Sequence, residues 1–522
     1  MIQQVQLRLS PSQAASNETI RQAACRAAHL AANRLNTLRV VRRSIDARGR
    51  NPLVELTLAL YTDNDHPEDI PPVEYPDVRS ACPVVVVGSG PAGMFAALKL
   101  IEYGYRPIVL ERGKDVHARR RDIKALCLEH IVDPDSNYCF GEGGAGTYSD
   151  GKLYTRSKKR GDTSGILARL VQHGASQEII TDARPHIGTD KLPTVVENIR
   201  RTIVNAGGSY LFGQCVQDIV IRQGQVCGVV TRNGERFEAP AVILATGHSA
   251  RDIYRMLHRK GIALQAKGTA IGVRIEHPQP LIDRIQYGSN GRGDYLPAAA
   301  YRLVAQSGGR GVYSFCMCPG GYIVPSATEP EQVVVNGMSP SARNGRKANS
   351  GIVVSIEPQD IPLPYAQDPT MGLLQYVCQV EHRAWQAGGG TQKAPAARMT
   401  DFCQGRISGT LNDTTYIPGI VPAELDWVLG EWVAPRLREG LLTFGRKMRG
   451  FYTEEATLIG VETRTSSPIR IPRDPRTLAH PQLDGLFPAG EGAGFAGGIV
   501  SAAIDGENCA QAAAAYLKEK KR

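Results

Sequence analysis

A run of four valines followed at once by closely spaced glycines constrains the fold of this chain more than any other feature. Residues 84–87 form an uninterrupted apolar, β-branched stretch, which is typical of a parallel strand buried on both faces. The stretch runs directly into a glycine-rich turn, and an apolar pattern with helical spacing follows. The turn consists of Gly88, Ser89, Gly90, Pro91, Ala92 and Gly93. This order of strand, turn and helix predicts a dinucleotide-binding unit.

The three glycines of the turn have separate functions in such a unit. Gly88 permits the tight turn, Gly90 lets the backbone approach a pyrophosphate, and Gly93 lets the helix pack closely against the strand. The N-terminus of the helix adds free N–H groups and a partial positive charge. A chance glycine-rich turn is the alternative, and the surrounding strand and helix patterns argue against it.

Glu111 ends a second short strand, which we expect at residues 107–110. It lies 23 positions after Gly88, a spacing that suits a carboxylate accepting hydrogen bonds from an adenosine ribose. A carboxylate at this position disfavours a 2′-phosphate. The ligand predicted from these residues is therefore FAD or NAD rather than NADP.

Length and composition indicate a folded protein of several domains. A chain of 522 residues exceeds what one hydrophobic core usually serves, and 42% hydrophobic with 21% charged residues is typical of a globular protein rather than a disordered one. The net charge of +10 is spread along the chain and suits flavin, nicotinamide or nucleic acid equally. The N-terminus lacks a signal pattern, and residues 83–98 are too short to span a bilayer. Eleven cysteines without a paired framework fit a reducing compartment, so we expect a cytoplasmic protein.

Residues 1–78 are predicted to form a small α+β module. Strand patterns cover residues 5–9, 38–46 and 52–61, and an alanine-rich helical pattern covers residues 18–35. The module carries a basic segment containing Arg39, Arg42, Arg43, Arg48 and Arg50. This segment is interpreted as a solvated strand edge, with docking onto the flavin domain or a partner, and nucleic-acid binding, as alternatives. A proline-rich linker at residues 65–77 follows.

Two stretches after Glu111 could contact a ligand. Residues 112–126 form a basic, helical pattern in which Arg119, Arg120 and Arg121 could hold phosphates or form a solvated helix face. Residues 140–152 are rich in glycine, so their main-chain amides could crowd a flat ring or an anion. We expect this loop to contact the dinucleotide or the reacting site, and a plain surface loop is the alternative.

The remaining parts of a nucleotide fold lie further along the chain. Strand patterns at residues 215–221, 225–231 and 235–238, separated by Gln-Gly and Asn-Gly turns, predict a three-stranded meander. A buried strand follows and ends in Ala245, Thr246 and Gly247. Near the C-terminus another strand ends at Gly490 and Glu491, and a helix is expected from about residue 498. The N-terminus of that helix could point its dipole at the electron-rich edge of a flavin.

Three segments together resemble the glutathione-reductase-like FAD-binding superfamily. They are residues 88–111, the meander with the strand that ends in Ala245, Thr246 and Gly247, and the C-terminal strand and helix around Gly490 and Glu491. The leading basic module, the loop at residues 141–153 and the single dinucleotide fingerprint resemble, more narrowly, a bacterial family of FAD-dependent dehydrogenases. The resemblance implies an α/β fold: a Rossmann-like FAD-binding domain with a β-meander, split by an inserted α+β cap domain, plus the N-terminal module. The implied domains are residues 1–78 (module), 79–261 and 451–522 (FAD-binding domain), and 262–450 (cap).

The resemblance also implies a set of FAD contacts. The turn after the first strand would hold the pyrophosphate, Glu111 the adenosine ribose, and Gly490 with Glu491 the ribityl chain. The chain has Glu491 where the wider superfamily usually has aspartate, which shifts the carboxylate by about one bond. The full predicted set is Gly88, Ser89, Gly90, Pro91, Ala92, Gly93, Glu111, Arg112, Gly143, Gly144, Thr147, Val216, Ala245, Thr246, Gly247, Gly490, Glu491, Gly497, Gly498 and Ile499.

Candidates for catalysis are weaker than those for cofactor binding. His248 could act at the edge of the cofactor, as could Arg251, or His248 could simply cap backbone groups. The spacing of Cys316 and Cys318 suggests a redox function. A disulfide across one residue closes a strained ring, however, so we expect the two thiols to pack near the flavin face without reacting. Arg274 and His277 are weaker still, and the polar loop at residues 336–344 is expected to be exposed at the substrate entrance. No metal cluster is predicted.

The function predicted from the sequence is that of a cytoplasmic FAD-dependent oxidoreductase acting on a small-molecule substrate. Because one fingerprint is visible, NAD(P)H, if used, would bind transiently at the cap. A flavin-dependent enzyme that modifies tRNA is one alternative, motivated by the positive charge. A non-catalytic flavin-binding protein is another.

Overall fold

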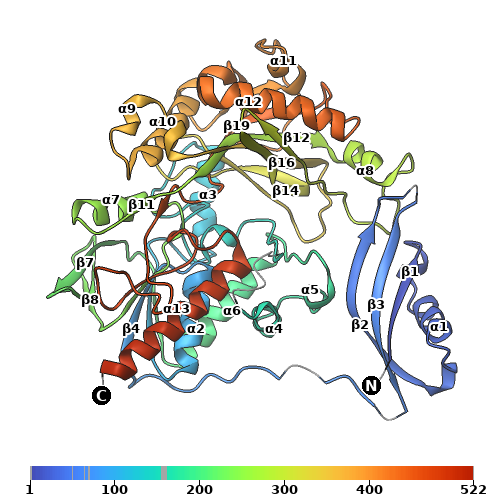
Figure 1. Cartoon of the computed structure of the whole chain (residues 1–522), viewed down its shortest axis with the longest axis horizontal. Coiled ribbons are helices and arrows are strands. Elements are labelled where there is room, and N and C mark those ends of the chain that lie inside the picture. The colour runs from blue at the N-terminus through green and yellow to red at the C-terminus, as the bar shows by residue number, and fades with distance from the viewer. Residues whose placement is uncertain (1–2, 50, 64, 69–70, 155–160, 521–522) are drawn as a thin grey trace.

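The computed structural model describes residues 3–49, 51–63, 65–68, 71–154 and 161–520. Figure 1 shows three units: a blue N-terminal module at one side, a unit with blue, green and red elements, and a yellow and orange unit above it. The chain leaves the sheet of the second unit after strand β10 and returns to it for β21, so the third unit is inserted. Strands β11 (Gln265–Ala266) and β20 (Ile469–Arg470) connect the two units and pair antiparallel with each other. We call residues 267–468 the inserted unit, and residues 78–266 with 469–520 the parallel-sheet unit.

Five parallel strands form the centre of the parallel-sheet unit. Val84 and Val86 of β4 pack among the helices on one face, whereas Val85 and Val87 pack against the meander side. The valine run is therefore buried on both faces, as predicted. The strand order is β21 (Leu486–Pro488), β10 (Val242–Leu244), β4 (Pro83–Val87), β5 (Arg106–Leu110) and β6 (Ser209–Leu211).

Helices cover one face of this sheet and an antiparallel meander covers the other. The meander and the helices after β4 and β21 lie close to the predicted positions, which gives the unit a Rossmann-like arrangement. The meander is β7 (Val216–Arg222), β8 (Gln225–Thr231) and β9 (Arg236–Glu238). The helices of the unit are α2 (Pro91–Glu102), α3 (Arg119–Leu128), α4 (Thr163–Gln172), α5 (Glu178–Thr181), α6 (Leu192–Asn205), α7 (Arg251–Arg259) and α13 (Ile499–Lys520). Of these, α7 packs on the meander side of the sheet, and α3 packs against residues of the inserted unit.

The inserted unit is a large, mainly antiparallel sheet with helices packed on it. Its strands are β12 (Thr269–Pro278), β13 (Val304–Ser307), β14 (Arg310–Pro325), β15 (Val335–Met338), β16 (Lys347–Ile356), β17 (Ala394–Arg398), β18 (Ile420–Pro422) and β19 (Thr457–Glu462). Its helices are α8 (Gln279–Tyr287), α9 (Leu363–Ala366), α10 (Gly372–Ala387), α11 (Met399–Cys403) and α12 (Leu425–Lys447).

The boundaries of this unit differ from the sequence prediction. Strand β19 pairs with both β12 and β17, so the inserted sheet extends past residue 450, where the predicted cap ends. This difference arises because nonlocal pairing, rather than local pattern, decides where this short strand lies.

The N-terminal module is a three-stranded sheet with one helix. Its elements are β1 (Gln3–Leu9), α1 (Asn17–Ala27), β2 (Leu35–Asp46) and β3 (Leu53–Thr62), in the sheet order β1-β3-β2. The predicted helix to residue 35 is too long, because the backbone turns at His29 with a φ of 51°. Arg50, Asp69 and Ile70 of the predicted basic segment and linker lie outside the described residues.

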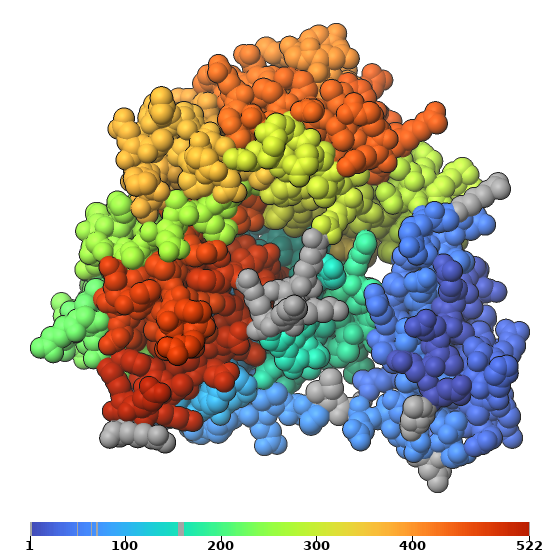
Figure 2. All heavy atoms as spheres, in the orientation of Figure 1, coloured from blue at the N-terminus to red at the C-terminus, as the bar shows by residue number. Residues whose placement is uncertain are grey.

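The module contacts the parallel-sheet unit through the edge of β2. The Ala183 N–H donates to the Arg43 carbonyl oxygen at 2.9 Å, next to a bridge between Arg43 and Asp182. Figure 2 shows the blue module as a lobe beside the teal segments of that unit. The backbone of the basic strand therefore docks onto the neighbouring unit, which covers part of an otherwise open sheet edge.

None of the helices within the described residues combines the length and the apolar content that crossing a membrane requires.

Candidate functional site

A cavity of about 380 Å³ lies between the parallel-sheet unit and the inserted unit. Its floor is formed by the turn after β4 and by the ends of β5 and β10, so it opens at the carboxyl ends of the parallel strands. Ligands of such sheets bind at this edge. The inserted unit contributes Phe315, Cys316, Asn336, Gly337 and Arg464 to the lining.

The glycine turn has the geometry that its sequence predicts. Gly88 has a φ of 100°, and a Cβ at Gly93 would lie 1.9 Å from the Gly88 carbonyl oxygen, so the helix packs too closely for a side chain. A Cβ at Gly90, in contrast, would meet no described atom within 4 Å. Gly90 therefore presents bare backbone to the cavity.

Glu111 lies in the cavity lining, but its carboxylate already has several partners. It accepts hydrogen bonds from the Ser89 N–H at 3.0 Å and the Ser89 hydroxyl at 2.5 Å. It also accepts from the N–H groups of Gly113 and Gly141, both at 2.9 Å. The carboxylate thus ties the turn to the glycine-rich loop, and its predicted contact with a ribose stays a prediction.

Arg119 holds that loop from behind, which neither interpretation of the basic helix predicted. Its side chain is fully buried, and its guanidinium donates to four carbonyl oxygens at 2.7 to 3.0 Å. Arg120 and Arg121 are exposed, as a solvated helix face requires. The fork of N–H groups on arginine suits such a set of carbonyls, but nothing in a run of three arginines shows which one points inward. The four acceptors belong to Asn137, Tyr138, Glu142 and Gly144.

Most of the predicted cofactor contacts meet at the cavity. Those in the lining are Gly88, Ser89, Gly90, Pro91, Ala92, Glu111, Arg112, Gly144, Val216, Ala245, Thr246, Gly247, Glu491, Gly497, Gly498 and Ile499. Four others lie behind it: Gly93, Gly143, Thr147 and Gly490. The Thr147 hydroxyl donates to the Glu142 carbonyl oxygen at 2.8 Å, and the Gly490 N–H donates to Asp505 Oδ2 at 2.7 Å. These residues support the wall rather than face the cavity.

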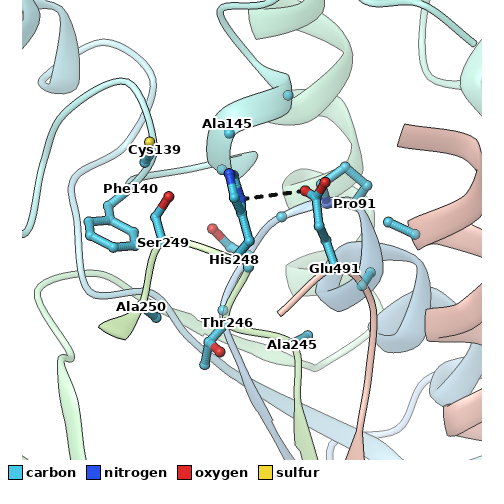
Figure 3. A pocket seen from close by; sticks show the side chains of 18 of the residues that line it. Pro91, Cys139, Phe140, Ala145, Ala245, Thr246, His248, Ser249, Ala250 and Glu491 are labelled. Atoms are coloured by element: carbon cyan, nitrogen blue, oxygen red, sulfur yellow. Dashed lines mark ion pairs between the residues drawn. The ribbon is translucent and has the colours of Figure 1, made fainter. Parts of the chain in front are cut away.

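His248 and Glu491 face each other across the cavity lining, as Figure 3 shows. His248 Nδ1 lies 3.6 Å from Glu491 Oε2. Burial, helped by the charges of Arg464 and Arg251, lowers the pKa of His248 to about 3. Burial also raises the pKa of Glu491 to about 7. At neutral pH the histidine is uncharged and the carboxyl is close to half protonated.

The other predicted catalytic candidates divide into two groups. Cys316 lines the cavity and Cys318 is buried beside it. Arg251, Arg274 and His277 are absent from the described lining and have structural partners. Arg251 pairs with Glu381 at 2.7 Å and so links α7 to α10 of the inserted unit. Arg274 pairs with Glu462 at 2.7 Å, and His277 Nε2 contacts the Phe451 carbonyl oxygen at 2.8 Å.

Several lining residues were not identified from the sequence. Lys152 and Asp150 belong to the predicted loop but were given no separate function, and Arg464 had no local signal. Asn336 and Gly337 line the cavity from strand β15, so the first part of the loop expected at residues 336–344 is not an exposed loop. A lysine two residues after an aspartate in a glycine-rich loop was the only available signal.

Five buried polar atoms of the lining have no hydrogen-bond partner within the described part of the chain. They are Gln214 Oε1, His248 Nε2, Ser249 Oγ, and Arg464 Nε and Nη1. Because burying an unpaired polar atom is costly, such atoms indicate a polar ligand. A Cβ at Gly247, Gly497 or Gly498 would meet no described atom within 4 Å, as at Gly90. The cavity therefore offers bare backbone at four glycines together with unpaired polar atoms.

Comparisons with known families assign both large units. Residues 82–271 match the model of the pyridine nucleotide-disulphide oxidoreductases, and residues 268–465 match that of FAD-dependent protein, C-terminal domain-like. Residues 1–61 match a domain of unknown function. The second match covers almost the same residues as the inserted unit. It extends past residue 450, where the predicted cap domain ends.

Comparisons with whole proteins extend this assignment. The chain is 42% identical over 508 residues to an uncharacterised protein of Clostridium beijerinckii, covering 93% of this chain and 94% of that protein. It is 28% identical over 219 residues to the protein FixC of Escherichia coli, covering 40% of this chain and 46% of FixC. A solved structure of a geranylgeranyl bacteriochlorophyll reductase-like protein from Thermoplasma acidophilum covers 84% of this chain and 79% of its own, with 13% identity and a TM-score of 0.36. Similarity at this level does not assign a function to this chain.

Proposed function

The chain belongs to the family of FAD-dependent oxidoreductases that includes the Clostridium beijerinckii protein, and we propose that it is a dehydrogenase or reductase with its flavin between the two large units. FAD is its cofactor. The parallel-sheet unit would bind the dinucleotide, and the inserted unit would act as a cap over the reacting face of the ring. The substrate, a small molecule, would enter on the side of the inserted unit.

The residues of the cavity fit FAD. Gly90 and the N-terminus of α2 would bind the pyrophosphate through backbone N–H groups. Gln214 and Ser249 supply unpaired polar atoms for the polar groups of the cofactor. Gly497 and Gly498 leave space directly before α13, whose N-terminus would face the flavin end.

Bound FAD supplies a two-electron acceptor and donor. The chain then contributes charge and protons around it. The N-terminal end of α13 carries a partial positive charge that would stabilise negative charge on the bound cofactor. The Glu491 carboxyl can hold a proton up to about pH 7. The neutral His248 ring lies beside it, with Nδ1 3.6 Å from Glu491 Oε2.

One observation carries this proposal: three glycine-lined segments, far apart in sequence, meet in a cavity that is closed on its other side by a second unit. The test is to mix the purified yellow protein anaerobically with NADH and with NADPH and to record the flavin absorbance. We expect one donor to bleach the flavin, with NAD(P)H binding transiently at the inserted unit. If neither donor bleaches it, and dithionite-reduced protein is not reoxidised by any acceptor, a non-catalytic flavin-binding function is correct. A cytoplasmic location stays a prediction.

A further inference from the structure

Cys316 and Cys318 lie at an irregularity in the sheet of the inserted unit. The pairing of β14 with β16 slips between Phe315 and Cys318, and Cys316 has a φ of 44°. Left-handed backbone at a residue other than glycine is uncommon, and bulges often lie beside active sites, where they redirect a side chain. Here the bulge places Cys316 in the cavity lining while Cys318 remains fully buried next to it.

Two cations from different parts of the chain face the two sulfur atoms. Lys152 Nζ, from the glycine-rich loop, lies 3.6 Å from both Cys316 Sγ and Cys318 Sγ. Arg274 Nη1 lies 3.9 Å from Cys318 Sγ, and Arg274 Nη2 donates to the Cys316 carbonyl oxygen at 3.2 Å. Asp150 binds both Lys152, at 3.4 Å, and Arg343, at 2.6 Å, and so holds the lysine in place. Cations at this range favour a thiolate.

The two thiols differ in their acidity. A hydrogen bond from the Cys318 side chain, followed by the charges of Lys152 and Arg274, holds the pKa of Cys316 below its usual value although burial opposes this. The same hydrogen bond and burial raise the pKa of Cys318. The surroundings therefore favour a thiolate at Cys316 and a thiol at Cys318. The charged and titratable groups around the pair are Lys152, Asp150, Arg343, Arg274, Glu462 and Glu491.

Other cysteines of the same cavity lack this arrangement. Cys139 Sγ lies 3.3 Å from the Ser326 hydroxyl, a neutral partner. Cys215 Sγ is 3.0 Å from Arg232, but that arginine is paired with Asp135, and burial raises the pKa of Cys215 to about 11. A cavity position alone therefore does not make a reactive thiol in this protein, and Cys215 provides a matched control.

We propose that Cys316 and Cys318 form a redox-active dithiol that exchanges two electrons with the flavin. Oxidation of the Cys316 thiolate and the Cys318 thiol forms one S–S bond and releases two electrons and one proton. Across a single residue this bond closes a strained ring, and strained disulfides are the readily reduced ones that serve in catalysis. Oxidised flavin accepts two electrons and one proton to form its reduced anion, so the exchange balances without a further reactant. Lys152 is a positioning residue that stabilises the thiolate. The class of substrate that such a pair serves is a disulfide or dithiol compound, and the inference rests on the proposed position of the flavin.

An anaerobic dithionite titration of the oxidised, FAD-loaded protein tests the proposal directly. We expect the wild type to consume about twice the reductant per flavin that Cys316→Ser and Cys318→Ser consume, because the disulfide takes two further electrons. Cys403→Ser, at a half-buried cysteine that is absent from the described cavity lining, should behave as the wild type. Equal consumption by the wild type and both variants would overturn the proposal. This titration does not use NAD(P)H, so a failure of the proposed donor and a failure of the thiol pair give different results.

Two further measurements guard against a variant that is merely misfolded. In oxidised wild type, the peptide containing both cysteines should be lighter by about 2 Da, which marks a disulfide. In reduced wild type, iodoacetamide at pH 6.5 should modify Cys316 at least about tenfold faster than Cys215, and Lys152→Met should remove most of that difference. An unchanged peptide mass, or equal alkylation of the two cysteines, would contradict the proposal.

Discussion

The turn after β4 and the bulge in β14 are two walls of one cavity, but they depend on the sequence in different ways. The turn presents its own backbone to the cavity, so the groups that we propose for pyrophosphate binding lie within six consecutive residues. Cys316, in contrast, depends on Lys152, which lies 164 positions earlier in the chain. The comparison shows that a backbone-binding motif can be identified locally, whereas the chemistry of a side chain depends on charges brought to it by the fold.

Replacing Gly90 is the most severe way to test the local side of this comparison. Gly90→Val places a side chain in the open space in front of the turn, where the pyrophosphate would lie. We expect flavin occupancy of the purified protein to fall to less than about a tenth of the wild-type value, since the isopropyl group would occupy the space that the phosphate needs. The measurement is the ratio of flavin to protein absorbance.

Gly409→Val is the matched control for this experiment. Gly409 is exposed, a Cβ at this position would meet no described atom within 4 Å, and the residue is absent from the described cavity lining. The control should keep its full flavin content. A Gly90→Val protein that also keeps its full content would show that the pyrophosphate does not lie against this turn.

The parallel-sheet unit could largely be predicted from the sequence, and the inserted unit could not. Valine runs, hairpin turns and glycine turns are local signals, and they place β4, the meander and α13 within a few residues. The end of the inserted unit was missed because β19 owes its place to pairing with β12 and β17. For the same reason the backbone positions of these local motifs that face the cavity were named, whereas the side chains of Lys152 and Arg464 were not.

Arg119 is an exception inside the parallel-sheet unit, because it supports a local motif through nonlocal contacts. Arg119→Leu would leave four carbonyl oxygens of the loop without their donor in a buried space. We expect the free energy of unfolding to fall by about 3 to 5 kcal/mol, with weaker flavin binding. Urea unfolding of the protein measures this change.

Arg120→Leu, at the exposed neighbouring position, is the control and should change the free energy of unfolding by less than about 0.5 kcal/mol. Similar values for the two variants would mean that the loop does not depend on the buried guanidinium. The whole nucleotide side of the cavity would then be held by local contacts.

Glu491 lies between the two walls and gives the smallest effect. Its carboxyl has a pKa of about 7 in the folded protein, raised by burial from an ordinary value of 4.5. A raised carboxyl pKa stabilises the fold below pH 4.5, and this contribution is lost as the pH rises to about 7. In the flavin-free protein, Glu491→Gln should therefore match the wild type near pH 4 and be more stable by about 2 to 3 kcal/mol at pH 8.

The pH dependence of flavin reduction then separates a catalytic from a purely structural Glu491. If its carboxyl supplies the proton, the plot of wild-type rate against pH should bend near pH 7, and the plot for Glu491→Gln should not. Glu454→Gln, at an exposed position, should keep the bend. A variant that changes the unfolding curves but keeps the bend would place the proton elsewhere.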